Sequence, residues 1–447
     1  DLASNCSYGL VSSFVLLYLT GTLGLDSAII GSLMLASKVL DGISDVIFGT
    51  LIDRTHSKLG KARPWMLFGQ VGVSLCLFLL FAIPAGSTTM QYIYFFIVYT
   101  ALNAVFYTAN GIAYSSLVAL ITKNNNERVQ LGSFRFMFAV VTNIFMGFAV
   151  TGMVEKFGSG AAGWRTTALI FAIVGLVVNT ISCLAVKELP EEELSGNTSE
   201  AAEEGKAVAE EKKHGFAETA KVLVHNKYYL MILAIYIVYY IMSNLTTGAG
   251  VFCATYYWGD GSLLGQFSMM KMFPVIIALA IAPVLIKKTG SMQKVNFWGY
   301  AISSVLGIPM IYFAMQKNLS MFLLFMFIKG IFAGTLSGSL NALIAEASGY
   351  TTRTTGIHMD GMMYSCSSLG VKVGGGIGTA AVGWLLKLGG FVGTATVQSE
   401  SAIRMIFNLY ITFPFVIGII ITVLLAFLDV EKANKKWDAE HQKEAQA

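Results

Sequence analysis

The chain has little of what a water-soluble protein needs. Only 13% of its 447 residues are charged, whereas about a quarter is usual for a soluble domain. Its five cysteines have wide, irregular spacings that match neither a zinc site nor a disulfide framework. It has only five histidines, no H-E-x-x-H motif and no convincing pairing of a serine with a histidine. These absences argue against a soluble domain and against an enzyme, and no cofactor is expected.

Hydrophobic sequence takes the place of charge. Hydrophobic residues make up 55% of the chain, and the mean hydropathy is +0.66. About 20 apolar residues are enough for a helix to cross a bilayer, and runs of this length recur along the whole sequence. We therefore expect an all-α membrane protein with twelve transmembrane helices. The predicted spans are 1–21, 28–52, 65–84, 90–121, 132–154, 165–186, 228–256, 263–287, 295–315, 318–345, 358–390 and 401–428.

Basic residues concentrate in alternate loops. The loops after even-numbered spans and the C-terminal tail hold most of them, for example Lys58, Lys123, Lys288 and Lys432. The positive-inside rule then predicts that these loops and both termini face the cytoplasm. Short juxtamembrane loops without interleaved aromatic residues do not resemble a nucleic-acid surface, so no nucleic-acid partner is expected.

The polar segment between spans six and seven divides the chain. We expect an N-terminal six-helix half at 1–186, a cytoplasmic linker at 187–227, a C-terminal six-helix half at 228–428 and a cytoplasmic tail at 429–447. Because residue 1 already begins a span, the first helix is expected to be truncated. Two six-helix halves around a central site are typical of secondary transporters.

Three ionisable residues interrupt the second span. Lys38, Asp41 and Asp45 lie within about 60° of one another on a helix, and each would cost several kcal/mol in lipid without water, an ion or a partner. Two carboxylates one turn apart must share a cation or hold a proton, and Ser44 could add an oxygen ligand. The alternative is a structural ion pair with Lys38 or Lys372. We predict a coupling site for Na⁺ or H⁺ at Asp41 and Asp45.

Polar and aromatic side chains also recur at helical spacing in the fourth span. The residues that share this face are Asn103, Tyr107, Asn110 and Tyr114. Hydroxyl-binding groups beside aromatic rings suit a carbohydrate. Hydrogen bonds between helices are the alternative explanation.

The loop after the second span carries the most specific motif. Gly49, Asp53, Arg54, Lys61 and Arg63 lie in a string, GTLIDRTHSKLGKARPW, that resembles the G-x-L-x-D-R-x-G-R-K loop of the major facilitator superfamily. Joined to Asp41 and Asp45 upstream, the string is similar to that of the glycoside-pentoside-hexuronide:cation symporter family, typified by melibiose permease. The resemblance implies the major facilitator fold and a gating role for this cytoplasmic loop.

Weaker matches to that family extend over nearly the whole chain. The resemblance implies substrate contacts at Asp1, Asn5, Asn110, Tyr114, Arg135, Ser368 and Lys372. Asn5 and Asn110 stand where melibiose permease has carboxylates, and Val46 replaces the usual proline. A different sugar specificity is therefore expected.

The resemblance and the residues together predict a secondary active transporter. The expected activity is cation-coupled symport of a glycoside, pentoside or related sugar by alternating access, with Na⁺ or H⁺ as the coupling ion. The alternatives are a transporter of the same fold for an amphiphile such as a lysolipid, and a sugar sensor that transports nothing. We expect the protein to work as a monomer surrounded by lipid in a bacterial plasma (inner) membrane.

Overall fold

The computed structural model describes residues 1–122, 124–189, 222–356, 360–395 and 397–444. Helices make up all the regular structure of these residues. Eleven helices among them are long and apolar enough to cross a membrane. A further helix, α2 (Ser27–Asp53), has 27 residues and contains Lys38, Asp41 and Asp45. The predicted all-α membrane architecture is confirmed, with eleven candidate membrane helices among the described residues and α2 as the predicted twelfth.

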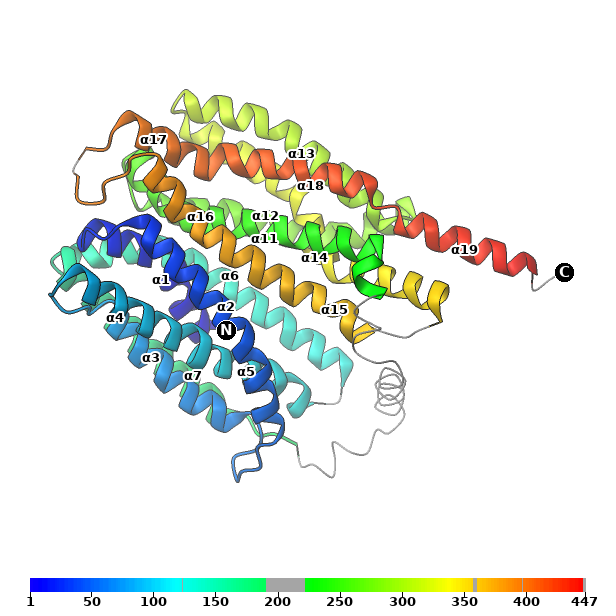
Figure 1. Cartoon of the computed structure of the whole chain (residues 1–447), viewed down its shortest axis with the longest axis horizontal. Helices are drawn as coiled ribbons and strands as arrows, with labels where there is room; N and C mark the ends of the chain where they lie inside the picture. Colours follow the sequence, from blue (N-terminus) through cyan, green and yellow to red (C-terminus); the bar gives the residue numbers. More distant parts are fainter. Residues whose placement is uncertain (123, 190–221, 357–359, 396, 445–447) are drawn as a thin grey trace. The chain divides into compact units, whose positions relative to one another are not determined.

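Two compact units account for the described residues, whose helices are labelled in Figure 1. The first contains the described part of Asp1–Gly196 together with Asn244–Met269 and Gly376–Tyr410. Its elements are α1 (Leu2–Leu17), α2, α3 (Arg63–Leu80), α4 (Thr88–Thr100), α5 (Thr108–Ile121), α6 (Asn125–Lys156), α7 (Gly160–Ala185) and α17 (Glu400–Phe407), with most of α16 (Gly375–Leu388). Three π-helical segments belong to it: η1 (Tyr18–Thr22), η2 (Ala101–Tyr107) and η3 (Cys253–Trp258).

The second unit contains the described part of Asn197–Ser243, Met270–Gly375 and Ile411–Ala447. Its helices are α13 (Met292–Met315), α14 (Leu319–Thr355), α15 (Asp360–Leu369), α18 (Phe413–Phe427) and α19 (Val430–Glu444), with the π-helical η4 (Gly370–Gly374). Helices α11 (Lys227–Phe252) and α12 (Leu263–Thr289) contribute residues to both units, as does η5 (Asn408–Thr412). Most of the predicted linker 187–227, residues 190–221, lies outside the described residues.

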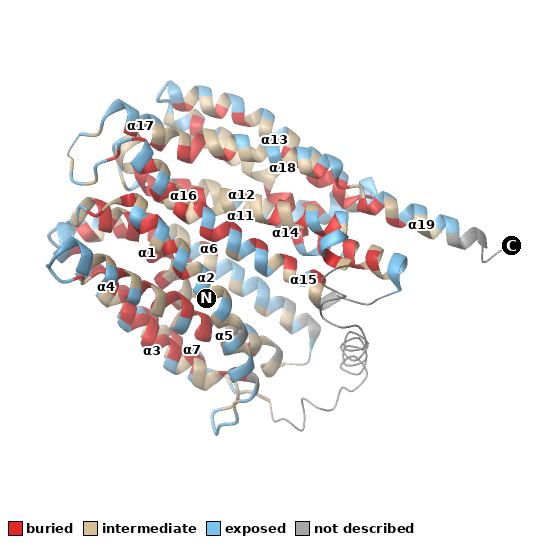
Figure 2. Ribbon diagram, viewed as in Figure 1, coloured by how far each residue is buried: buried red, intermediate tan, exposed pale blue. Residues whose placement is uncertain are grey.

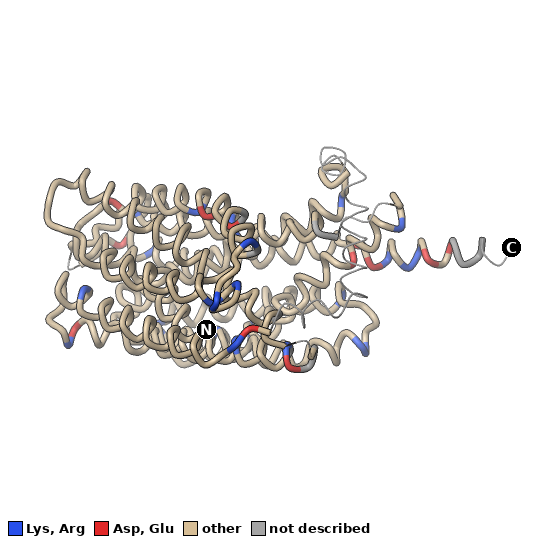
Figure 3. Tube along the Cα trace, turned by 90° about the horizontal axis from the view of Figure 1, so that it is seen from below, with Lys and Arg blue, Asp and Glu red and all other residues tan. Residues whose placement is uncertain are grey.

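Side chains on the surface of the helices are largely apolar. Phe68 of α3 is 74% exposed and Val305 of α13 is 65% exposed, and exposed residues run along the helices as well as in loops (Figure 2). Charged residues are sparse along the helices, and α19 carries a dense run of them (Figure 3). An apolar surface on this scale is expected of helices that face lipid.

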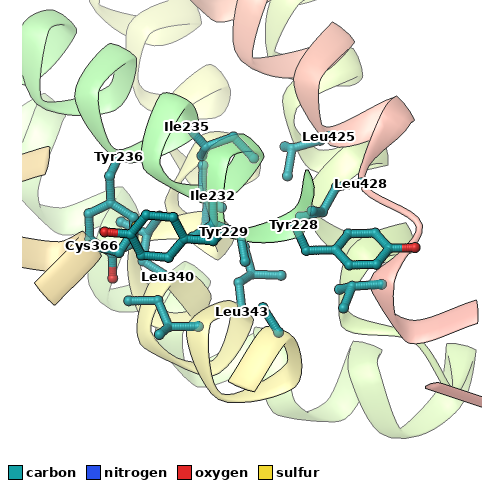
Figure 4. Packing of buried hydrophobic residues seen from close by; sticks show 14 of the residues in the cluster. Tyr228, Tyr229, Ile232, Ile235, Tyr236, Leu340, Leu343, Cys366, Leu425 and Leu428 are labelled. Atoms are coloured by element: carbon teal, nitrogen blue, oxygen red, sulfur yellow. The ribbon is translucent and has the colours of Figure 1, made fainter. Parts of the chain in front are cut away.

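The core of the second unit is built from aromatic and aliphatic side chains of several helices. Tyr229, Ile232 and Tyr236 of α11 pack with Leu340 of α14 and Leu425 of α18 (Figure 4). The Tyr236 hydroxyl donates to Asn341 Oδ1 at 2.8 Å. Burying a tyrosine in this way requires a partner for its hydroxyl, and α14 supplies it.

Helix starts are fixed by side-chain caps. Asp26 accepts hydrogen bonds from the backbone N–H groups of Ala28 and Ile29, at 2.9 and 3.3 Å, which begins α2. Its carboxylate also pairs with Lys387 at 2.6 Å. Partial burial acts to raise the pKa of Asp26, but the hydrogen bonds from Lys387 and the backbone outweigh burial and lower it.

Two glutamates cap helices to which they are not adjacent in sequence. Glu188, just after α7, accepts from the backbone N–H groups of Lys61, Ala62 and Arg63 at 2.7, 3.0 and 2.9 Å. Glu431, just after α18, accepts from the backbone N–H of Gln293 at 3.0 Å and from the Ser291 hydroxyl. Each carboxylate therefore satisfies N–H groups at the start of a helix that would otherwise lack partners.

Candidate functional site

The charged residues of α2 meet a hydroxyl from α5. Lys38 Nζ lies 3.4 Å from Asp41 Oδ2, and the Thr108 hydroxyl donates to Asp41 Oδ1 at 2.6 Å. The Asp41 side chain is only 13% exposed. Ser44 donates to the backbone carbonyl of Asp41 at 2.9 Å, and Asp45 lies one turn further along α2, half-buried. Asp41 is thus held between an ammonium group and a hydroxyl.

Thr108 was not predicted from the sequence. It lies at the start of α5, directly after η2, and its hydroxyl oxygen also lies 2.9 Å from the backbone carbonyl oxygen of Asn103. A π-helical turn leaves backbone carbonyls without their usual α-helical partner. The only sequence signal was a hydroxyl residue next to the predicted polar stripe.

The polar stripe of the fourth span does not keep to one face. Asn103 is buried and donates to the backbone carbonyl of Tyr99 at 2.9 Å, whereas the Tyr107 ring stacks on Tyr8 of α1 with centroids 5.7 Å apart. Asn110 donates to Gln70 Oε1 of α3 at 2.9 Å and is only 2% exposed. Asn103 and Tyr107 lie within η2, whereas Asn110 and Tyr114 follow it in α5, so the stripe points in more than one direction.

Three of the predicted substrate residues come together from three elements. Arg135 Nε of α6 lies 3.2 Å from Asp1 Oδ2, and the Tyr114 hydroxyl of α5 donates to the same oxygen at 3.1 Å. The Arg135 guanidinium group lies 4.3 Å from the centroid of the Tyr114 ring, within the range of a cation–π contact. A carboxylate, a guanidinium group and a phenol ring therefore face one another.

The two asparagines have different surroundings. Asn5 donates to the backbone carbonyl of Asp1 at 2.9 Å and accepts from Asn143 of α6 at 3.3 Å. The Oδ1 atom of Asn110 is buried and has no hydrogen-bond partner among the described residues. A carbonyl oxygen left in this state is costly. Contact between Asn110 and a substrate would require the packing of α5 on α3 to loosen.

A small polar cavity lies inside the first unit, beside Lys38. Its polar lining residues are Tyr8, Ser12, Lys38, Tyr99, Asn103, Asn244, Thr247 and Thr379. The volume is about 20 Å³, enough for a water molecule but far too small for a sugar. A sugar could enter this place only if the walls moved apart.

Ser368 and Lys372 belong to the second unit. Ser368 is exposed on α15, and Lys372 is half-buried within η4. Two glycines of that segment lie close to α11: a Cβ on Gly370 would be 2.3 Å from Tyr236 Cβ, and one on Gly374 would be 2.4 Å from the Ile237 carbonyl oxygen. The substrate role of Ser368 and Lys372 stays a prediction.

The loop predicted to act as a gate is attached to the end of α7. The backbone N–H groups of Lys61 and Arg63 donate to Glu188, and Arg63 Nε donates to the backbone carbonyl of Cys183 at 2.9 Å. Arg54 is exposed just after α2, and a Cβ added at Gly49 would meet open space. The side chain of Asp53 lies outside the described residues. Glu188 was missed in the sequence because nothing local links it to this loop.

Oxygen atoms are the ligands that the α2 site offers a cation. Among the described residues, no group of three or more His, Cys, Asp and Glu side chains is placed to hold a metal ion. The nearby oxygens belong to Asp41, Ser44 and Thr108. Hard cations prefer such oxygen ligands, so the arrangement suits Na⁺, and an aspartate in the same place can hold a proton.

Known proteins similar to this chain are transporters. The family model described as "MFS/sugar transport protein" matches residues 1–432. The isoprimeverose transporter of Lactiplantibacillus pentosus is 26% identical over 100% of this chain and 90% of that protein. The putative glycoside/cation symporter YagG of Escherichia coli (strain K12) is 24% identical over 94% of this chain and 88% of that protein. A solved structure from the proton dependent oligopeptide transporters has a TM-score of 0.64 at 14% identity and 97% coverage of both chains, which supports the fold alone.

Proposed function

Because the chain belongs to the MFS/sugar transport protein family, we propose that it carries a glycoside, pentoside or related sugar together with Na⁺ or H⁺. The protein is an integral membrane transporter with similarity to sugar transporters, and it is not an enzyme. The proposal adds cation coupling, a bacterial inner-membrane location and cytoplasmic termini. The similarity to a protein named as a glycoside/cation symporter supports the coupling.

The observation that carries the proposal is Asp41 in the middle of an apolar helix. A carboxylate there is expensive unless its charge is neutralised and its oxygens are hydrogen-bonded. In this conformation the Lys38 ammonium group neutralises the charge and the Thr108 hydroxyl donates a hydrogen bond. A cation that binds Asp41 and Asp45 takes over the neutralising role of Lys38, so cation binding and the position of the Lys38 side chain become linked. Coupled transport requires cation binding to be linked to the conformation of the protein in this way.

The proposed sugar site is the group formed by Asp1, Tyr114 and Arg135. A carboxylate and a guanidinium group bind sugar hydroxyls in opposite senses, one as acceptor and the other as donor. The Tyr114 ring, and the stacked rings of Tyr8 and Tyr107, offer apolar faces for the sugar ring. Asn5, Asn110, Ser368 and Lys372 remain proposed contacts.

The coupling role can be tested in membrane vesicles with Asp41→Asn and Asp45→Asn. Moving one positive charge inward is worth about 2.3 kcal/mol per 100 mV, or roughly fifty-fold accumulation of a neutral sugar. Both variants should lose cation-driven accumulation yet retain exchange of sugar across the membrane, because exchange needs no net movement of charge. Asp260→Asn in the exposed loop before α12 is the matched control and should accumulate sugar normally.

The same vesicles can identify the substrate. A panel of glycosides and pentosides is assayed with sodium and pH varied independently. Full active uptake in both aspartate variants would contradict the coupling assignment, and no uptake of any sugar by the wild-type protein would contradict the substrate class.

A further inference from the structure

A second pocket lies in the first unit, away from the proposed sugar and cation sites. It is formed by the loop between α2 and α3, the start of α3, the end of α5 and the residues that follow α7. Its volume is about 460 Å³. Its charged lining residues are Lys58, Lys61, Arg63, Lys187 and Glu188. The positive-inside rule places this loop on the cytoplasmic side of the membrane.

Positive charge dominates the pocket. Among its described lining residues, four side chains are lysine or arginine, and the one carboxylate, Glu188, already accepts three backbone N–H groups at the start of α3. Lys58 and Lys187 are exposed at its edge. Lysine and arginine side chains gathered in this way bind phosphate oxygens.

Two apolar stripes begin at the level of the pocket. On α3 the exposed residues Phe68, Val71 and Leu75 lie on one face, and their exposures are 74%, 52% and 57%. On α7 the exposed residues Ile181 and Leu184 lie in the last two turns and are 61% and 59% exposed. Helices α3 and α7 pack side by side (Figure 1). Since α3 starts and α7 ends at the pocket, both stripes lead from it into the membrane.

We propose that this pocket binds the phosphodiester headgroup of an anionic membrane lipid, with the acyl chains lying along the stripes of α3 and α7. Basic pockets at the cytoplasmic ends of membrane helices suit such headgroups. A free phosphate ion would use the lysines but not the apolar stripes, so the combination favours a lipid. Because Lys61 and Arg63 belong to the loop, bound lipid would also stabilise the conformation in which the loop is attached to α7.

The test is a lipid titration of the purified full chain in neutral detergent, read by native mass spectrometry. Dioleoyl phosphatidylglycerol is compared with dioleoyl phosphatidylcholine and with inorganic phosphate. The variants are Lys58→Gln, Lys187→Gln and the double variant, and Lys288→Gln is the control because it removes an exposed lysine outside the pocket. Each pocket substitution should weaken phosphatidylglycerol binding about fivefold, the factor that corresponds to about 1 kcal/mol per basic residue.

The expected pattern has three parts. Phosphatidylglycerol binds more tightly than phosphatidylcholine, the double variant weakens it more than either single variant, and Lys58→Arg binds as the wild type does because the charge is kept. Unchanged phosphatidylglycerol binding in the double variant would overturn the site. Inorganic phosphate that competes with phosphatidylglycerol at equal concentration would overturn the lipid assignment, since the stripes would then contribute nothing.

Discussion

Asp41 is held by two partners of different chemistry. Its two carboxylate oxygens have different partners, the Lys38 ammonium group at 3.4 Å and the Thr108 hydroxyl at 2.6 Å. An incoming cation of the same charge can displace the Lys38 ammonium group from Asp41. The Thr108 hydroxyl can instead stay next to Asp41 and direct an oxygen lone pair toward that cation. Thr108 is therefore the partner that we expect to remain next to Asp41 when the cation binds.

Thr108→Val should weaken activation of transport by the coupling cation. Valine has the same shape but no hydroxyl, so it removes one hydrogen bond to a charged group, which is worth about 1.5 to 3 kcal/mol. The cation concentration for half-maximal uptake should rise by about tenfold or more. Thr108→Ser keeps the hydroxyl and is the matched control. Equal behaviour of the valine and serine variants would remove Thr108 from the site.

At the scale of elements, the π-helical segments decide which side chains face one another. Each π turn contains about one residue more than an α-helical turn and shifts the following face by up to about 100°. Asn103 and Tyr107 lie within η2, and Thr108, the first residue after it, contacts Asp41. Such segments are frequent at functional sites, and η4 contains Lys372.

The sequence was sufficient to predict the membrane helices and to single out the acidic residues of α2, because both inferences depend on local composition. Long apolar runs form membrane helices whatever surrounds them, and Lys38, Asp41 and Asp45 stand out against such a run. The pairing of Asn110 with Gln70 and the position of Thr108 could not be predicted. Both depend on η2, whose residues do not differ in composition from an ordinary helix. The Glu188 cap depends on a contact across more than 120 residues, which no local pattern reveals.

The cap by Glu188 gives a prediction about α3. Glu188→Gln keeps an acceptor oxygen but removes the charge from three hydrogen bonds, and hydrogen bonds to charged groups are worth about 1.5 to 3 kcal/mol. The midpoint of thermal unfolding in detergent should fall by a few degrees. Glu155→Gln, at an exposed position near the end of α6, should leave it unchanged. A variant at Glu188 as stable as the Glu155 control would show that the cap contributes little.

Over the whole molecule, the same capping arrangement occurs in both predicted six-helix halves. The third membrane helix of each half, α3 or α13, begins at a carboxylate that follows the last membrane helix of that half, Glu188 after α7 or Glu431 after α18. Repeated halves are typical of transporters that alternate between two open states. The division into halves at 1–186 and 228–428 stays a prediction, and the two compact units have different bounds.

The proposed alternating access would require a contact that can open. The start of α2 packs against α16 closely enough to be such a contact. Ser27 donates to the backbone carbonyl of Gly383 at 2.9 Å. A Cβ on Gly383 would lie 2.2 Å from the Ser27 carbonyl oxygen, and one on Gly31 would lie 2.7 Å from the carbonyl oxygen of Ala380. Only glycine permits backbones to approach so closely. This contact belongs to the first unit, as does the small cavity beside Lys38.

Gly383→Val should hold this contact open, because the valine side chain cannot fit against the backbone of α2. The readout is a cysteine introduced at Ser12, which lines the cavity, in a protein whose five native cysteines are all buried. A membrane-impermeant thiol reagent added from the outside should label Ser12→Cys several-fold faster in the Gly383→Val background. Gly152→Val is the matched control, since a Cβ at Gly152 would meet open space. Equal labelling in both backgrounds would show that the α2 and α16 contact does not close the cavity, and faster labelling only from the inside would reverse the predicted orientation.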